Sequence, residues 1–171
     1  MRTMDEIKVG NPKSPLIKFS WLFLFTIFVI LAGLVIHEYN HVWAGAIQGD
    51  MSGKIYFDFE YFYGIPVPVT GHASMPTNSF TLIAGGLFTG LMFLVVAYWA
   101  RITKSLHDYY VEFSFMLVGA CHLVYSVWEV NMLHKIPFSE YSLGSNIIYI
   151  LVSALVIFAY RKELKMYLYE S

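Results

Sequence analysis

Long apolar segments alternate with short stretches that carry most of the charges of this chain. Four segments, roughly residues 17–44, 78–100, 110–132 and 144–160, are predominantly apolar. Each is long enough, or nearly so, for a helix that crosses a hydrocarbon core, which takes about 20 residues. The pattern therefore predicts an all-α membrane protein with four transmembrane helices, in which residues 1–171 form a single integral membrane domain.

Residues 55–63 follow a different period, because apolar and aromatic side chains alternate there with Asp58 and Glu60. Such alternation is typical of a β-strand. The Gly-Ile-Pro sequence at residues 64–66 predicts a turn, and residues 67–69 could return as a second arm. The prolines in this stretch limit pairing to a sheet edge. We therefore expect a short interfacial β-hairpin between the first two helices.

Composition agrees with a membrane protein, since 57% of the residues are hydrophobic and 13% are charged. The net charge is −1, and no tract rich in lysine and arginine appears. Nucleic acid is therefore not an expected partner, whereas the lipid bilayer is. The single cysteine, Cys121, excludes an internal disulfide.

The basic residues predict how the helices are oriented. They collect before the first helix, between the second and third, and after the fourth, whereas the other two connections carry more acidic than basic residues. By the positive-inside rule, both termini are expected in the cytoplasm. The end of the first helix, the hairpin and the end of the third helix should then lie on the outer side.

The most specific motif is His37-Glu38-Tyr39-Asn40-His41, which lies near the end of the first apolar segment. On a helix, positions i and i+4 project from one face, so His37 and His41 can offer two imidazole nitrogens to one Zn²⁺. Glu38 is then placed to act as a general base on water. Ionisable groups are costly at membrane depth and need a partner there, which a metal would supply. A purely interfacial position for these side chains is the other interpretation.

A zinc site of this kind needs a third protein ligand, which should come from another helix at a similar depth. His37 lies about 20 residues, or about 30 Å, from the start of its helix. Glu129 lies about 19 residues along the third helix, which runs in the same direction, so Glu129 is the preferred ligand. His122, about 10 Å deeper on the same helix, is the alternative. Without a metal, Glu129 could pair with water or Lys135, and His122 could be a hydrogen-bonded core residue.

Two further polar features bear on the site. Asn131 or His72 could donate a hydrogen bond to the oxyanion that forms when water attacks a peptide carbonyl, and the sequence does not rank them. Gly86 and Gly90 form a G-x-x-x-G pattern in the second helix, which is typical of close helix packing in membranes. We expect that architectural role for the two glycines.

The chain resembles the site-2 protease family of intramembrane zinc metalloproteases, as a small and divergent member. The likeness rests on the H-E-x-x-H motif at 37–41, on the segment Trp43-Ala44-Gly45 with the aromatic loop ending at His72, and on residues 81–87, which are similar to the Ala-Gly-Pro-Leu segment of the family. It covers roughly residues 30–95. The resemblance implies cleavage of membrane-associated peptides. The family usually supplies its third ligand as an aspartate on a later helix, but this chain has no aspartate in a suitable span, so Glu129 would have to substitute.

The sequence thus predicts a membrane-embedded zinc metallopeptidase, with His37, His41 and Glu129 as metal ligands and Glu38 as general base. The strand at residues 55–63 could accept an extended substrate by β-addition. Two other hypotheses remain open. In one, a four-helix membrane protein binds haem or a metal without hydrolysis through His37 or His41 and His122. In the other, an inactive relative binds membrane peptides and keeps the motif as a structural metal clip.

Overall fold

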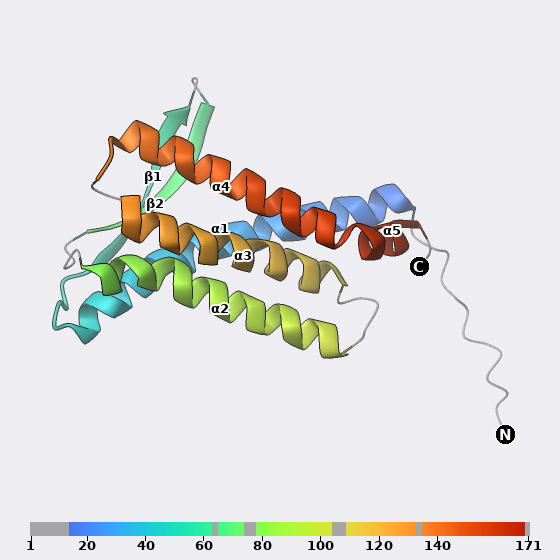
Figure 1. Ribbon diagram of the computed structural model, residues 1–171, viewed down its shortest axis with the longest axis horizontal. Coiled ribbons are helices and arrows are strands. Elements are labelled where there is room, and N and C mark those ends of the chain that lie inside the picture. The colour runs from blue at the N-terminus through green and yellow to red at the C-terminus, as the bar shows by residue number, and fades with distance from the viewer. Residues whose placement is uncertain (1–13, 63–64, 74–77, 104–108, 133–134, 170–171) are drawn as a thin grey trace, which may run out of the picture.

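The computed structural model describes residues 14–62, 65–73, 78–103, 109–132 and 135–169. At residues 57–62, 65–73 and 138–139 it describes the backbone alone. Four long helices form a bundle: α1 (Pro15–Ile47), α2 (Ser79–Thr103), α3 (Tyr109–Met132) and α4 (Phe138–Ala159). Each holds a segment long and apolar enough to cross a membrane. The predicted all-α membrane fold with four spans is therefore confirmed (Figure 1).

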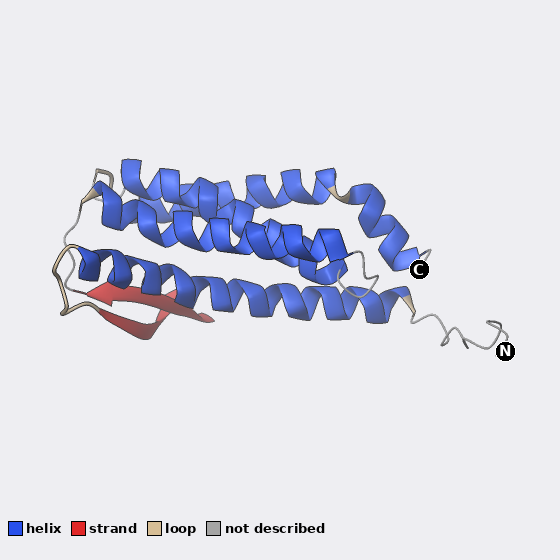
Figure 2. Ribbon diagram, turned by 90° about the horizontal axis from the view of Figure 1, so that it is seen from below, coloured by secondary structure: helices blue, strands red, loops and turns tan. Residues whose placement is uncertain are grey.

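The expected hairpin is also present, as β1 (Lys54–Phe62) and β2 (Ile65–Ala73). The strands are antiparallel, and their register pairs Phe59 with Pro68 and Tyr61 with Pro66. The returning strand is longer than the predicted residues 67–69, because each strand of a two-stranded sheet has an open edge on which a proline costs no ladder hydrogen bond. Both strands contact α1, and Figure 2 shows the hairpin beside the half of α1 that carries the motif.

Two boundaries differ from the prediction. Helix α4 begins at Phe138 rather than near residue 144, and a separate short helix, α5 (Arg161–Tyr169), follows its end. The first turn of α4 carries Glu140, and α5 carries four charged residues. Charged residues at these places hide both boundaries from a prediction that rests on runs of apolar residues.

Local signals in the sequence explain where α1 starts and stops. Pro15 occupies the first turn, where its missing N–H removes no helical hydrogen bond, and the Ser14 hydroxyl accepts from the backbone N–H of Ile17 at 3.4 Å. The helix ends at Ile47, and Gly49 then adopts a φ of 92°. That left-handed conformation suits glycine, which has no Cβ.

Glycines bring α2 and α3 close together, as their spacing predicts. A Cβ on Gly86 would lie 2.5 Å from the carbonyl oxygen of His122 and 2.6 Å from Cβ of Ser126. A Cβ on Gly90 would lie 2.6 Å from Cγ of Leu123 and 2.9 Å from the carbonyl oxygen of Gly119. No side chain fits at either position without displacing α3, so the G-x-x-x-G pattern is architectural. The contact fixes α3 against α2, and with it the level of the Glu129 carboxylate.

Helix α4 is held less tightly than the other three. Its described buried side chains are Tyr141 and Ser145, and most of the helix presents aliphatic side chains outward. It packs against α3, where the indole of Trp128 fills the space next to Gly144. In a membrane, the outward face of α4 meets lipid, so its apolar exposure carries no penalty.

Candidate metal centre

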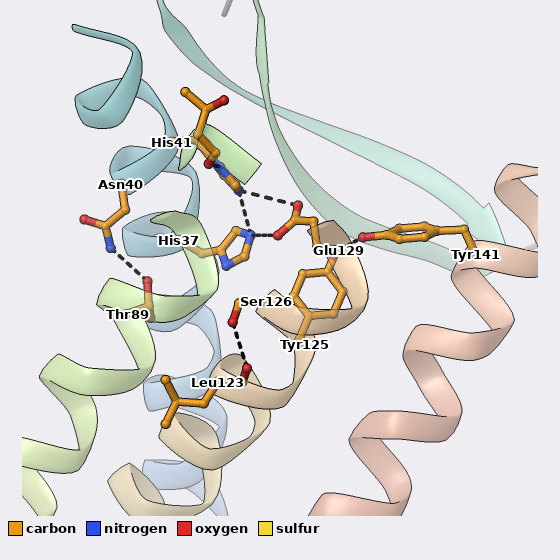
Figure 3. Close-up of polar contacts among 10 residues, drawn as sticks. His37, Asn40, His41, Thr89, Leu123, Tyr125, Ser126, Glu129 and Tyr141 are labelled. Carbon is orange, nitrogen blue, oxygen red and sulfur yellow. Dashed lines mark hydrogen bonds and ion pairs between the residues drawn. The ribbon is translucent and has the colours of Figure 1, made fainter. Parts of the chain in front are cut away.

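The end of the bundle that holds the hairpin also gathers the ionisable residues of the motif. His37 and His41 project from α1 and Glu129 projects from α3, and the three side chains are 5%, 0% and 5% exposed, respectively. One ligand atom from each lies within 4.8 Å of the other two. The residues that depth arguments select from the sequence are thus brought together, from two helices that are far apart in the chain (Figure 3).

The spacing of these ligand atoms suits a small cation. Nε2 of His37 and Nε2 of His41 are 3.0 Å apart. Each is 3.5 Å from an oxygen of Glu129, Oε2 for His37 and Oε1 for His41. In a tetrahedral site with bonds of 2.0–2.1 Å, neighbouring ligand atoms lie about 3.3 Å apart. The two 3.5 Å distances reach different oxygens of the carboxylate, and a set with one atom from each residue spans at most 4.8 Å. The three residues are therefore close enough to share one small cation after minor side-chain adjustment.

A backbone carbonyl selects the tautomer of His41. Nδ1 of His41 lies 2.6 Å from the carbonyl oxygen of Thr81 and therefore carries the proton that it donates there. Nε2 is then left with its lone pair directed at His37 and Glu129. This second contact is the arrangement that fixes ring orientation in metal-binding histidines.

The position of Thr81 depends on how α2 begins. The Asn78 side-chain oxygen accepts hydrogen bonds from the backbone N–H groups of Phe80 and Thr81, at 3.1 and 3.0 Å. Its amide nitrogen in turn donates to the Gln48 side chain at the end of α1. Asn78 therefore caps α2 and ties it to α1, which sets the Thr81 carbonyl opposite His41.

Glycine also makes room for the His41 ring. A Cβ on Gly85 would overlap Nε2, Cε1 and Cδ2 of His41. The imidazole therefore packs directly against the backbone of α2, and this contact restricts its rotation. Together with the Thr81 carbonyl, Gly85 holds the ligand atom in one place.

Polar atoms in this cluster are left without hydrogen bonds. Within the described residues, Nδ1 of His37 and Oε2 of Glu129 are buried and have no hydrogen-bond partner. An unsatisfied buried polar atom is unfavourable, and a carboxylate among apolar helices more so. A cation bound between the two Nε2 atoms and the carboxylate would stabilise that carboxylate, which is a second reason why the site suits a metal. It would not satisfy Nδ1 of His37, because that nitrogen is not the ring atom that faces Glu129.

His122, the alternative third ligand, stands outside this group. Its ring centroid is 5.3 Å from that of His37 and 6.3 Å from the ring of Phe93. Gly33 on α1 leaves the space that its Nε2 occupies, since a Cβ there would lie 2.8 Å from that nitrogen. The residue is buried in the bundle, but its Nδ1 has no hydrogen-bond partner among the described residues, so the expected hydrogen-bonded core role is not what the structure shows at that atom.

Of the two predicted oxyanion donors, Asn131 is hydrogen-bonded elsewhere and His72 is not tested by the structure. The Asn131 amide nitrogen donates to the carbonyl of Val127 at 2.7 Å, at an exposed position on α3. His72 belongs to β2, and its side chain lies outside the described part of the chain.

Two tyrosines near the cluster were missed. The ring of Tyr125 packs 5.5 Å from that of His37, and its hydroxyl is 2.6 Å from the hydroxyl of Tyr141 on α4 (Figure 3). A signal was present in the sequence, because Tyr125 precedes Glu129 by four residues and so shares its helix face.

Comparison of the chain with models of protein families, with curated proteins and with solved structures found no match. The arguments about function therefore start from the geometry of the cluster.

Proposed function

We propose that this chain is a membrane-embedded zinc metallopeptidase that hydrolyses peptide bonds of membrane-associated substrates, as a divergent relative of the site-2 proteases. The observation that carries the proposal is the buried group of His37, His41 and Glu129, in which one ligand atom from each residue lies within 4.8 Å of the other two. Two imidazoles and one carboxylate are a ligand set that zinc takes in hydrolytic enzymes, with the fourth position left for water.

The three ligands would hold the ion, and Glu38 would move the proton. When bound, zinc supplies Lewis acidity toward a carbonyl oxygen and lowers the pKa of a water molecule. Glu38 follows His37 directly on α1, and its carboxylate interacts electrostatically with His41. We assign to it the removal of a proton from the attacking water and the return of that proton to the leaving amine.

The surrounding bundle favours such chemistry. Apolar helices keep the effective dielectric low around the cluster, which strengthens the action of each charge on a reacting group. The hairpin offers open strand edges close to the end of α1, where an extended peptide could add as a further strand. A helical membrane substrate would have to unwind before it could pair there.

Metal content tests the proposed site directly. Detergent-purified protein should contain one zinc per chain, and His37→Ala and Glu129→Ala should each lose it. His122→Ala is the matched control, because it removes a buried imidazole beside the cluster and should leave the zinc in place. Folded protein without metal, or loss of zinc only with His122, would overturn the assignment. A Soret band in the purified protein would favour haem binding instead.

The catalytic assignment needs a second experiment. Glu38→Gln should keep the zinc and lose cleavage of casein in detergent, since an amide cannot accept the proton from water. Cleavage that persists in the purified variant would remove Glu38 from its role. Full zinc occupancy without cleavage in the unmodified protein would point to a peptide-binding relative that has lost catalysis.

A further inference from the structure

A pair of tyrosine hydroxyls lies next to the cluster and has no role in the chemistry considered so far. Tyr125 on α3 and Tyr141 on α4 approach each other with their oxygens 2.6 Å apart. Figure 3 shows the pair beside Glu129, and the ring of Tyr125 packs 5.5 Å from that of His37. The pair therefore lies next to two of the proposed metal ligands.

Packing fixes the ring of Tyr125 on both sides. Its centroid lies 5.5 Å from that of His37, and it stacks on Tyr149 at 5.5 Å with an angle of 23° between the planes. Tyr125 also shares a helix face with Glu129, one turn away. Its hydroxyl is therefore held on a rigid element at a fixed place relative to two metal ligands, as a precise hydrogen-bond donor requires.

The two hydroxyls together can orient one proton toward a third group. A phenol has one proton to donate and two lone pairs that accept. If the Tyr141 hydroxyl donates to the Tyr125 oxygen, the proton of Tyr125 points elsewhere, and its oxygen is made a better donor by the bond that it accepts. Tyrosine is among the side chains that stabilise tetrahedral oxyanions.

We propose that Tyr125 donates a hydrogen bond to the oxyanion that forms during peptide hydrolysis, and that Tyr141 is the positioning residue that orients its hydroxyl. This inference rests on the proposed peptidase function. The water oxygen bonds to the carbonyl carbon while its proton passes to Glu38. The C–N bond then breaks, and that proton goes to the amine. Tyr125 donates a hydrogen bond but keeps its own proton throughout, so it transfers no atom or electron in the reaction.

Binding of acetohydroxamate tests the donor without any substrate. The probe binds zinc or Co²⁺ through a negatively charged oxygen, which resembles the oxyanion of the reaction. Its dissociation constant is measured from the change that it causes in the visible spectrum of protein loaded with Co²⁺. Tyr125→Phe keeps the ring and removes only the hydroxyl. It should leave the metal content unchanged and raise the dissociation constant of the probe about tenfold. That factor corresponds to the loss of one well-placed hydrogen bond of about 1.4 kcal/mol. Tyr141→Phe should raise the dissociation constant by a smaller factor.

Kinetics with casein add a second readout. Tyr125→Phe should lower kcat by about 100-fold with little change in KM, because the bond forms only in the transition state. Tyr160→Phe is the control, since its hydroxyl also makes a hydrogen bond, to Glu112 at 2.9 Å, but at the opposite end of the bundle. It should change neither quantity.

The outcomes separate this inference from the proposed function. Protein that binds no metal would overturn both. Metal binding with the same probe affinity in Tyr125→Phe as in the unmodified protein would overturn the role of Tyr125 alone. A larger loss with Tyr141→Phe than with Tyr125→Phe would reverse the two roles and overturn the assignment as stated.

Discussion

Replacing Gly85 with alanine should displace the His41 imidazole and weaken metal binding. The added Cβ would lie 2.6 Å from Cε1 and 2.7 Å from Cδ2 of that ring, whereas ordinary contact begins at 3.4 Å. Nε2 of the ring would lie nearer still, so the ring or the helix must move by at least about 0.8 Å, the difference between 3.4 and 2.6 Å, because a close-packed interior cannot absorb the overlap.

A displacement of this size is large for a metal ligand. Metal–ligand distances are held to within about 0.2 Å, and the loss of an orienting contact alone costs about 10–100-fold in affinity. Gly85→Ala moves the ring and strains its hydrogen bond to the Thr81 carbonyl together. We therefore expect at least a tenfold loss of zinc affinity, or about 1.4 kcal/mol.

Competition with a coloured chelator in detergent measures that affinity. Gly90→Ala is the matched control on the same helix, because its Cβ would meet Leu123 at the same 2.6 Å but would touch no metal ligand. It should destabilise the contact between α2 and α3 and lower the zinc affinity less than Gly85→Ala does, because it shifts Glu129 together with α3 but leaves the His41 ring in place. Equal zinc affinity in Gly85→Ala and the unmodified protein, with both folded, would refute the idea that α2 fixes the His41 ring.

Two further substitutions probe the contacts around the site. Removing the 3.0 Å hydrogen bond from Asn40 to Thr89 with Asn40→Ala should lower the free energy of unfolding in detergent by about 0.6 kcal/mol, the typical value for such bonds, and leave the zinc in place. A Thr89→Val change should add nothing further in the double variant, so additive losses would show that the two side chains do not interact. Gly144→Ala should displace the Trp128 indole and separate α4 from α3. Because Tyr141 moves with α4, the affinity for acetohydroxamate should fall while the metal content stays constant. Unchanged probe affinity in that variant would contradict the link through α4.

The sequence predicts the bundle well because membrane helices must satisfy their backbone hydrogen bonds internally and must match the bilayer in length. Those two constraints leave a signal in hydropathy alone. The start of α4 and the whole of α5 were not predicted because charged residues interrupt the apolar pattern there. The hairpin was found through the period of its side chains.

Depth along the helices was enough to pair Glu129 with His37 and His41, since helices of known direction share a common scale of 1.5 Å per residue. The sequence does not predict in the same way how each helix is rotated about its own axis. Helices α3 and α4 are apolar on nearly every side, so hydropathy does not say that Tyr125 and Tyr141 turn toward the cluster. The contact with the Thr81 carbonyl leaves no signature in the sequence, because the backbone of every residue offers the same carbonyl acceptor.

The length of α1 sets where a bond would be cut relative to the lipid. Lys18 is the first cation within α1, and a lysine near a helix end can extend its ammonium toward the headgroups. His37 follows 19 residues later, about 28 Å along the axis, which nearly equals the thickness of the hydrocarbon layer of about 30 Å. Under the proposed activity, cleavage therefore happens at the far boundary of the oil phase. One fragment stays dissolved in lipid and the other enters water, so the two products part into different solvents and cannot readily recombine.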